Sequence, residues 1–440
     1  MHVCQRWRQI VFASPLRLNL RILCTSRTRV RENLRIWPTF PIVIEYSHPG
    51  RAIRPREGNI IAALNHPDRV CDVSLDIKGS QLGAMTTVMK RPFPVLTRLR
   101  IRSDDGNLPV LPKEFLGGSA PSLQEITLSG IPYPTLPALL LTASNLVALE
   151  LRRIPPTGYI SPQAMVTCLA ALPRLVTFEI QFQSATPLPE PTRSPASRTV
   201  LPDLTSFQFK GASEYLEDLV TRIDSPQLDR ILIVYLNQLV DFQIAQLSEL
   251  IERSVALTPF RHAQVIFSGD RVSFDMCRHE FGRSEIHPTP CRPPTKTDIS
   301  CRGIDWQVSH MAQVLSQFSA TLSNIVCLTF MFPNEPLPVQ GEGADGADWR
   351  LLLQQFPAVR SMHVSGKLAR HLVIALEDIP QDMVADVLPS LDLIYLEGQP
   401  ASSITSFVAA RQLSDHPVFI VDLESDRERL REIEGLSRRG

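Results

Sequence analysis

The stretch from Leu146 to Leu151, Leu-Val-Ala-Leu-Glu-Leu, shows the pattern that recurs along most of this 440-residue sequence. An apolar residue is followed by two residues of any type, a second apolar residue, one residue of any type and a third apolar residue. Copies begin at Val70, Leu96, Leu123, Leu146, Leu175, Leu204, Leu228, Ile325, Val359 and Leu391. A pattern repeated this often is a property of the whole fold.

The spacing of the copies indicates the kind of repeat. From Val70 to Leu228 successive copies begin 23 to 29 residues apart, the usual length of one leucine-rich repeat, and the last two steps are 34 and 32 residues. Proline cannot continue a helix, so a proline shortly before a copy ends the preceding segment and lets a strand begin. Such prolines are Pro94, Pro121, Pro173, Pro202, Pro226, Pro357 and Pro389.

The second and third apolar residues of a copy lie two positions apart, so both point to the same face of a short strand. One strand cannot bury that face alone, but stacked copies can. Helical or irregular returns are expected after the strands, among them 81–90, 112–116, 137–142, 162–172 and 213–223. The sequence therefore predicts an α/β fold, a horseshoe-like leucine-rich-repeat solenoid with a parallel sheet on its concave face.

The composition limits the classes of partner. Apolar residues make up 44% of the chain and charged residues 20%, with a formal net charge of zero, so the chain can build a core and has no global field for nucleic acid or an anionic membrane. No apolar run approaches the roughly 18 to 20 residues of a membrane span. The eight cysteines follow no framework spacing and there is no Asn-x-Ser/Thr acceptor, which favours a cytoplasmic or nuclear location.

The first residues of the sequence are basic and partly amphipathic. Seven arginines precede Glu32, the first acidic residue, as in a mitochondrial presequence. The apolar residues of the first segment, however, follow helical spacing; they are Val3, Trp7, Ile10 and Val11. We therefore favour a short amphipathic helix that caps the first repeat, because the end of a solenoid otherwise exposes its core.

Part of this segment resembles the last third of an F-box. Val-Cys-Gln-Arg-Trp-Arg runs from Val3 to Arg8, and Ser-Pro-Leu follows from Ser14 to Leu16. Together with the repeats, this chain is similar to fungal-type F-box/leucine-rich-repeat proteins, with the first part of the F-box missing. The resemblance implies the substrate-recognition subunit of a cullin-RING (SCF-type) ubiquitin ligase. The module that binds the ligase adaptor would include Val3, Cys4, Trp7, Arg8, Val11 and Pro15.

The missing first part of the F-box leaves an alternative open: a non-catalytic repeat scaffold that no longer binds the ligase adaptor. In either case we divide the chain into an F-box-like remnant (1–25), a transition segment (26–60), the solenoid (61–398), and a C-terminal cap with a charged tail (399–440). Loop insertions are expected near 184–200, 269–303 and 333–348, and further strands at 42–46 and 264–267.

Two segments carry residue types used in catalysis or metal binding. The insert at 269–303 contains Cys277, His279, His287, Cys291 and Cys301, but their spacing lacks the tight pairs of a structural zinc site. An enzyme acting on a small ligand would require this insert to be ordered around a metal, which a zinc analysis would test.

The second segment is Gly341 to Gly346, which has the spacing of a dinucleotide fingerprint. No strand leads into it, and Glu342 and Asp345 would repel a pyrophosphate. We therefore expect a binding protein with no catalytic residue, no cofactor and no metal.

The candidate partner surface lies between the apolar positions of the strands. Residues that alternate with buried ones point to the other face of the sheet, which is the concave face in this prediction. The side chains expected there as a partner surface are Asp72, Asp76, Arg98, Arg100, Arg102, Glu150, Arg152, Glu179 and Tyr395. A solvated face with incidental charges explains the same residues equally well, so the choice between a protein-binding surface and a plain solvated one stays open.

Overall fold

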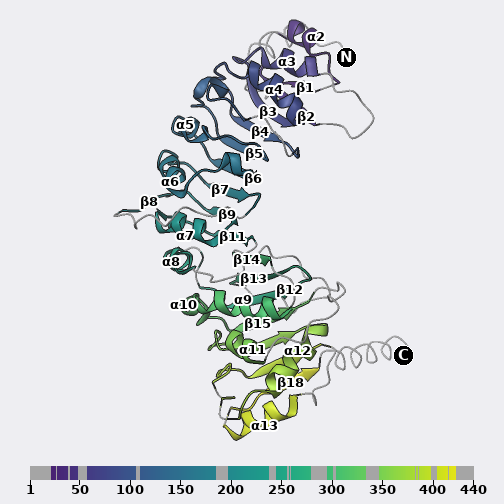
Figure 1. The fold of residues 1–440 in the computed structure, drawn as a ribbon, viewed down its shortest axis with the longest axis vertical. Helices are drawn as coiled ribbons and strands as arrows, with labels where there is room; N and C mark the ends of the chain where they lie inside the picture. The colour runs from purple at the N-terminus through teal and green to yellow at the C-terminus, as the bar shows by residue number, and fades with distance from the viewer. Residues whose placement is uncertain are drawn as a thin grey trace, which may run out of the picture. The chain divides into compact units, whose positions relative to one another are not determined.

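The computed structural model describes residues 21–25, 27–37, 40–47, 57–105, 110–184, 197–236, 244–254, 257, 259–278, 295–300, 304–332, 346–381, 383–384, 386–397, 404–414 and 416–422. The chain forms two compact units. The N-terminal unit is Met1–Gly211 with Thr221–Gln227, and the C-terminal unit is Ala212–Val220 with Leu228–Gly440. Each unit is α/β with a mostly parallel sheet (Figure 1).

In the N-terminal unit the sheet strands follow one another in chain order, and every pair is parallel. The strands are β1 Ile22–Cys24, β2 Ile42–Ser47, β3 Val70–Asp76, β4 Arg98–Arg102, β5 Glu125–Ser129, β6 Ala148–Ile154, β7 Thr177–Phe182 and β9 Ser206–Gly211. The sheet thus begins before residue 61, within the segments predicted as the F-box-like remnant and the transition.

The repeat pattern sets the register of this sheet. The second apolar residue of one copy pairs with the second of the next, as Leu149 does with Ile126 on one side and with Phe178 on the other. All three side chains are at most 1% exposed. Further along, Phe178 and Phe207 stack with ring centroids 5.5 Å apart. Because each buried side chain contributes about 1.5–3 kcal/mol, a slip by one residue is strongly disfavoured.

Short returns connect these strands on one side of the sheet. The helices are α2 Val30–Ile36, α3 Glu57–Leu64, α4 Gly79–Val88, α5 Leu136–Leu140 and α6 Pro162–Ala170, with 3-10 turns at Phe115–Gly118 and Pro156–Gly158. Helices α5 and α6 lie next to each other (Figure 1). Two short parallel strands, β8 Thr199–Val200 and β10 Ile223–Asp224, form a separate pair. The predicted return segments are therefore correct in place, although several are shorter than expected.

The C-terminal unit has a different strand order, β11-β14-β13-β12-β15-β16-β17-β18. Its strands are β11 Arg230–Tyr235, β12 His262–Phe267, β13 Arg271–Cys277, β14 Thr295–Ser300, β15 Cys327–Met331, β16 Ser361–Val364, β17 Leu393–Leu396 and β18 Phe419–Asp422. Its helices are α7 Ser213–Thr221, whose last residue belongs to the other unit, α8 Ala245–Arg253, α9 Ile304–Ser316, α10 Ser319–Leu322, α11 Gly346–Leu353, α12 Gly366–Glu377 and α13 Thr405–Leu413. The segment expected as a cap therefore supplies a helix, α13, and a further parallel strand, β18.

The expectation that 269–303 is an inserted loop is wrong at both ends of that segment. Strands β13 and β14 pair antiparallel with each other, and β13 also pairs antiparallel with β12, so both strands belong to the sheet. Apolar and polar residues alternate along β13, and its apolar side chains Val272 and Phe274 are buried. Residues 279–294 and 301–303, with His279, His287, Cys291 and Cys301, lie outside the described residues.

A buried tryptophan organises the core of the C-terminal unit. Trp349 of α11 is fully buried, with its ring centroid 5.7 Å from that of Phe267 and 5.6 Å from that of Phe330. Helix α9 packs against α11 and against β13 and β14. The large ring therefore joins a helix to two strands whose residues lie far apart in the sequence.

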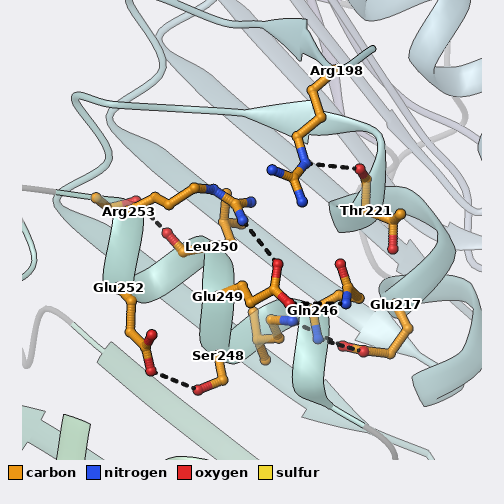
Figure 2. Close-up of polar contacts among 11 residues, drawn as sticks. Arg198, Glu217, Thr221, Gln246, Ser248, Glu249, Leu250, Glu252 and Arg253 are labelled. Atoms are coloured by element: carbon orange, nitrogen blue, oxygen red, sulfur yellow. Dashed lines mark hydrogen bonds and ion pairs between the residues drawn. The ribbon is translucent and has the colours of Figure 1, made fainter. Parts of the chain in front are cut away.

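Carboxylates of preceding helices hold the starts of two helices in this unit. Glu217 of α7 accepts hydrogen bonds from the backbone N–H groups of Gln246 (2.8 Å) and Leu247 (3.0 Å) in α8. Figure 2 shows Glu217 beside Gln246. Glu377 of α12 accepts similarly from Ser406 (3.1 Å) and Phe407 (3.4 Å) in α13. These bonds satisfy donors that a helix leaves unpaired at its first turn. Burial raises the pKa of Glu217 to about 7, while the two backbone donors oppose that shift.

Candidate binding surface

A row of polar side chains crosses β3 to β7 on the face opposite the core positions, and we call it the charged face. It consists of Asp72, Ser74, Asp76, Arg98, Arg100, Arg102, Glu125, Thr127, Glu150, Arg152, Glu179 and Gln181. Parallel register places these residues side by side across strands. Asp72 pairs with Arg98, for example, and Asp76 pairs with Arg102.

Most of the charges on this face are compensated across neighbouring strands. The Arg98 guanidinium lies 2.5 Å from the Asp72 carboxylate, and the Arg100 guanidinium lies 3.0 Å from Glu125. The Arg98 and Arg100 side chains are 39% and 57% exposed. Exposed pairs of this kind contribute about 0–1 kcal/mol each, so they add little stability and leave the arginines accessible.

One pair on the charged face is much better protected. The Arg152 guanidinium binds the Glu179 carboxylate in two places, Nε to Oε1 at 2.7 Å and Nη2 to Oε2 at 2.9 Å, and Gln181 donates to Oε1 at 2.6 Å. Burial raises the pKa of Glu179, and Arg152 opposes that rise. The expectation that Glu179 faces solvent is wrong, because its side chain is 2% exposed beneath these two donors.

Arg153 ties the ends of three strands together. Its guanidinium donates to the Ser103 carbonyl oxygen at 3.0 Å and to the Ser129 hydroxyl at 3.1 Å, and lies 2.5 Å from Asp104. The hydrogen bond from Arg153 holds the pKa of Asp104 below its usual range. Beside this contact, Gly130 has φ +72°, and a Cβ there would overlap the Ser103 carbonyl oxygen. The sequence pattern gave no indication of this contact.

A hollow of about 620 Å³ opens at the ends of β2 to β6. Its lining residues are Thr25, Arg27, Glu45, Tyr46, Ser74, Leu75, Asp76, Arg100, Ile101, Arg102, Thr127, Ser129 and Arg152. Four of the predicted surface residues therefore meet here, namely Asp76, Arg100, Arg102 and Arg152.

Sequence reasoning missed the contribution of β1 and β2 to this hollow. The signal was present in Ile44-Glu45-Tyr46, which alternates like Val73-Ser74-Leu75 of the first full copy. The structure pairs Glu45 with Ser74 and Tyr46 with Leu75. Pro41 stands at the first apolar position of the pattern and hides the relationship.

The last predicted surface residue, Tyr395, belongs to the C-terminal unit. Its ring stacks on His363 with centroids 4.1 Å apart and an interplanar angle of 12°. The side chain is 9% exposed, so it presents little of its ring to solvent. The residues predicted to bind the ligase adaptor, Val3, Cys4, Trp7, Arg8, Val11 and Pro15, lie outside the described residues.

Three further observations bear on the kind of site. Among the described residues, no group of three or more His, Cys, Asp or Glu side chains could hold a metal ion. In the same part of the chain, no helix is both long and apolar enough to cross a membrane. A scan with protein-family models and a search of curated proteins each found no match to this chain.

Proposed function

We propose that this chain is a leucine-rich-repeat solenoid whose charged face binds a protein partner. The observation that supports this proposal most directly is the run of accessible charges across consecutive parallel strands. The Arg100 and Arg102 side chains are 57% and 61% exposed. The core does not need these residues, and arginine is enriched at protein interfaces.

We further propose that the partner is a substrate of a cullin-RING (SCF-type) ubiquitin ligase, with this chain as the recognition subunit. The support is the resemblance of Val3–Arg8 and Ser14–Leu16 to the last third of an F-box, placed before an array of repeats. In this function the N-terminal segment binds the ligase adaptor and the charged face holds the substrate. The chain itself performs no catalysis and uses no metal or cofactor.

Co-purification with the ligase adaptor tests the link to the ligase. The full chain, a Trp7→Ala variant and a Trp37→Ala variant are each mixed with purified adaptor. Trp37 lies in the N-terminal unit, stacked on Phe40 with centroids 5.4 Å apart, so it controls for the general loss of a tryptophan. Capture by the full chain and by Trp37→Ala, but not by Trp7→Ala, is the expected result. If none of the three captures the adaptor, the chain is a repeat scaffold without a ligase partner.

A further inference from the structure

The hollow on the charged face has an acidic side and a basic side. Glu45 on β2 and Asp76 on β3 are both exposed, and within the described part of the chain neither carboxylate is in an ion pair. On the other side, Arg100 and Arg102 extend from β4 and Arg152 extends from β6. Within β2 to β4 the carboxylates and the arginines therefore lie on different strands, and one further cation, the exposed Arg27, lines the hollow after β1.

The structure also keeps these two sides from neutralising each other. Asp76 and Arg102 are register partners, yet Arg102 turns to Asp104, with its Nε 3.6 Å from Oδ1. Asp104 is held in turn by Arg153 at 2.5 Å. Both side chains of the Arg102–Asp104 pair are 61% exposed, and such a long, exposed pair is weak and easily exchanged for a better partner.

We propose that this hollow selects a dipolar peptide segment of a protein partner. A lysine or arginine of the segment lies against Glu45 and Asp76, and an aspartate or glutamate of the same segment lies against Arg100 and Arg102. The planar guanidinium groups suit a carboxylate, which they can bind through two hydrogen bonds. This proposal rests on the proposed protein-binding function and specifies the class of segment recognised.

The dimensions of the sheet set the spacing of the two charges. Neighbouring strands lie about 4.8 Å apart, so Glu45 on β2 and Asp76 on β3 are one to two strand spacings from the arginines of β4, or roughly 5 to 10 Å. An extended segment advances about 3.3 Å per residue. Side chains two residues apart point to the same face of an extended segment, so the opposite charges of the bound segment are expected two residues apart.

Charge repulsion supplies the selectivity. A uniformly acidic segment would place a carboxylate against Glu45 or Asp76, and a uniformly basic one would place a cation against Arg100 or Arg102. Like charges in contact disfavour the wrong partner, so the hollow discriminates as much by repulsion as by attraction. A partner with both signs avoids either conflict.

A random-peptide display selection on the immobilised full chain tests this proposal. The same selection is run on Asp76→Arg, on Arg102→Asp and on the double swap, which reverses both sides through Glu45→Arg and Asp76→Arg together with Arg100→Asp and Arg102→Asp. Arg91→Glu serves as the control, because Arg91 is exposed and does not line the hollow. We expect enriched peptides to carry a basic and an acidic residue two positions apart.

The variants separate dipolar recognition from simple attraction to arginine. Either single change should deplete these peptides by about tenfold, the effect of losing roughly 1.4 kcal/mol. The double swap should restore them, because a free peptide can bind in the reverse direction. This restoration also shows that the exchanged side chains leave the fold intact.

Three results would overturn the proposal. They are enrichment of uniformly charged peptides, an enrichment unchanged by Asp76→Arg, and a double swap that fails to restore binding. Peptides that bind all variants equally would reject the hollow but leave a protein-binding function in place. A selection with no enrichment over the empty support would count against both the hollow and the proposed function.

Discussion

The two units of this protein show what the repeat pattern controls and where its control ends. In the N-terminal unit, consecutive copies give consecutive parallel strands, and apolar position pairs with apolar position throughout β3 to β9. In the C-terminal unit no copy occurs between Leu228 and Ile325, and there β13 and β14 enter the sheet as an antiparallel pair. The antiparallel pairs therefore lie in the stretch without copies, although strands outside the copies, such as β1 and β18, also pair in parallel.

The units also treat charge differently. Carboxylates of the charged face are mostly matched by arginines near the surface. In the C-terminal unit, Asp275 and Asp298 are 6% and 7% exposed, with the Lys296 ammonium 3.4 Å from Asp298. Burial raises the pKa of Asp275 to about 6, Asp298 adds to the rise, and Lys296 opposes it. The inserted strands therefore bring titratable groups into the interior.

Trp349→Ala should produce the largest change and should affect the C-terminal unit selectively. Removing a fully buried aromatic side chain leaves a cavity and lowers the free energy of unfolding by about 3–5 kcal/mol. Hydrogen exchange should show faster exchange in β12 and β15 and little change in β5 and β6. Equal loss of protection in both units would contradict the division into two separately packed cores.

Glu179→Ala should destabilise the N-terminal unit by about 2 kcal/mol, because it removes two charge-assisted bonds of Arg152 and leaves it only the Glu150 carboxylate at 3.2 Å among its ion-pair partners in the described residues. The matched change at the more exposed Arg100–Glu125 pair, Glu125→Ala, should cost less than about 1 kcal/mol. Urea denaturation of both variants gives the comparison. If the two costs are equal, the burial of Glu179 does not distinguish its ion pair from the surface pairs.

Asp275→Asn should remove a change of about 1–2 kcal/mol that the free energy of unfolding of the C-terminal unit otherwise shows with pH. With a pKa raised from 3.8 to about 6, the folded protein binds more protons than the unfolded chain between those values, so stability falls as pH rises through that window. Urea midpoints at pH 4 and pH 6.5 measure the effect. Asp203→Asn, at an exposed turn, is the control.

The sign of that effect should be opposite at Asp104, because Arg153 lowers its pKa. The stability that Asp104 contributes is fully present above the pKa that this residue has in the unfolded chain. It is lost as the pH falls through the lower pKa of the folded protein. A stability that rises steadily from pH 4 to 6.5 in the C-terminal unit of the parent protein would contradict the assignment to Asp275.

Glu377→Ala should have the smallest effect, about 1 kcal/mol, through loss of the bonds at the start of α13. The expected cost arises because Ile404, which precedes α13, offers no side-chain cap of its own. In the N-terminal unit, by contrast, α6 is capped locally by Ser161. Glu377→Gln keeps an acceptor and should retain most of the stability, as thermal unfolding would show.

Several features could be read from the sequence because they depend on neighbours along the chain. The alternation around Leu149 and Leu151 places both side chains on one face wherever the strand lies, and Ser161-Pro162 marks the start of α6. The alternation at Val272 and Phe274 carries the same information, although the Arg, Pro, Cys and His content of the surrounding segment favoured a loop interpretation.

The sequence alone determined the α/β class, the position of the repeated strands and the face on which their charges lie, because period-two burial is a local property of the chain. Only the tertiary structure decided that Arg152 binds Glu179, that Arg153 reaches Ser103 and Ser129, and that Glu45 shares a hollow with Arg100. These contacts join different strands. They form only once the strands that carry these side chains have become neighbours. Which strands become neighbours depends on the free energy of the whole folded chain, and not on the residues next to each side chain in the sequence.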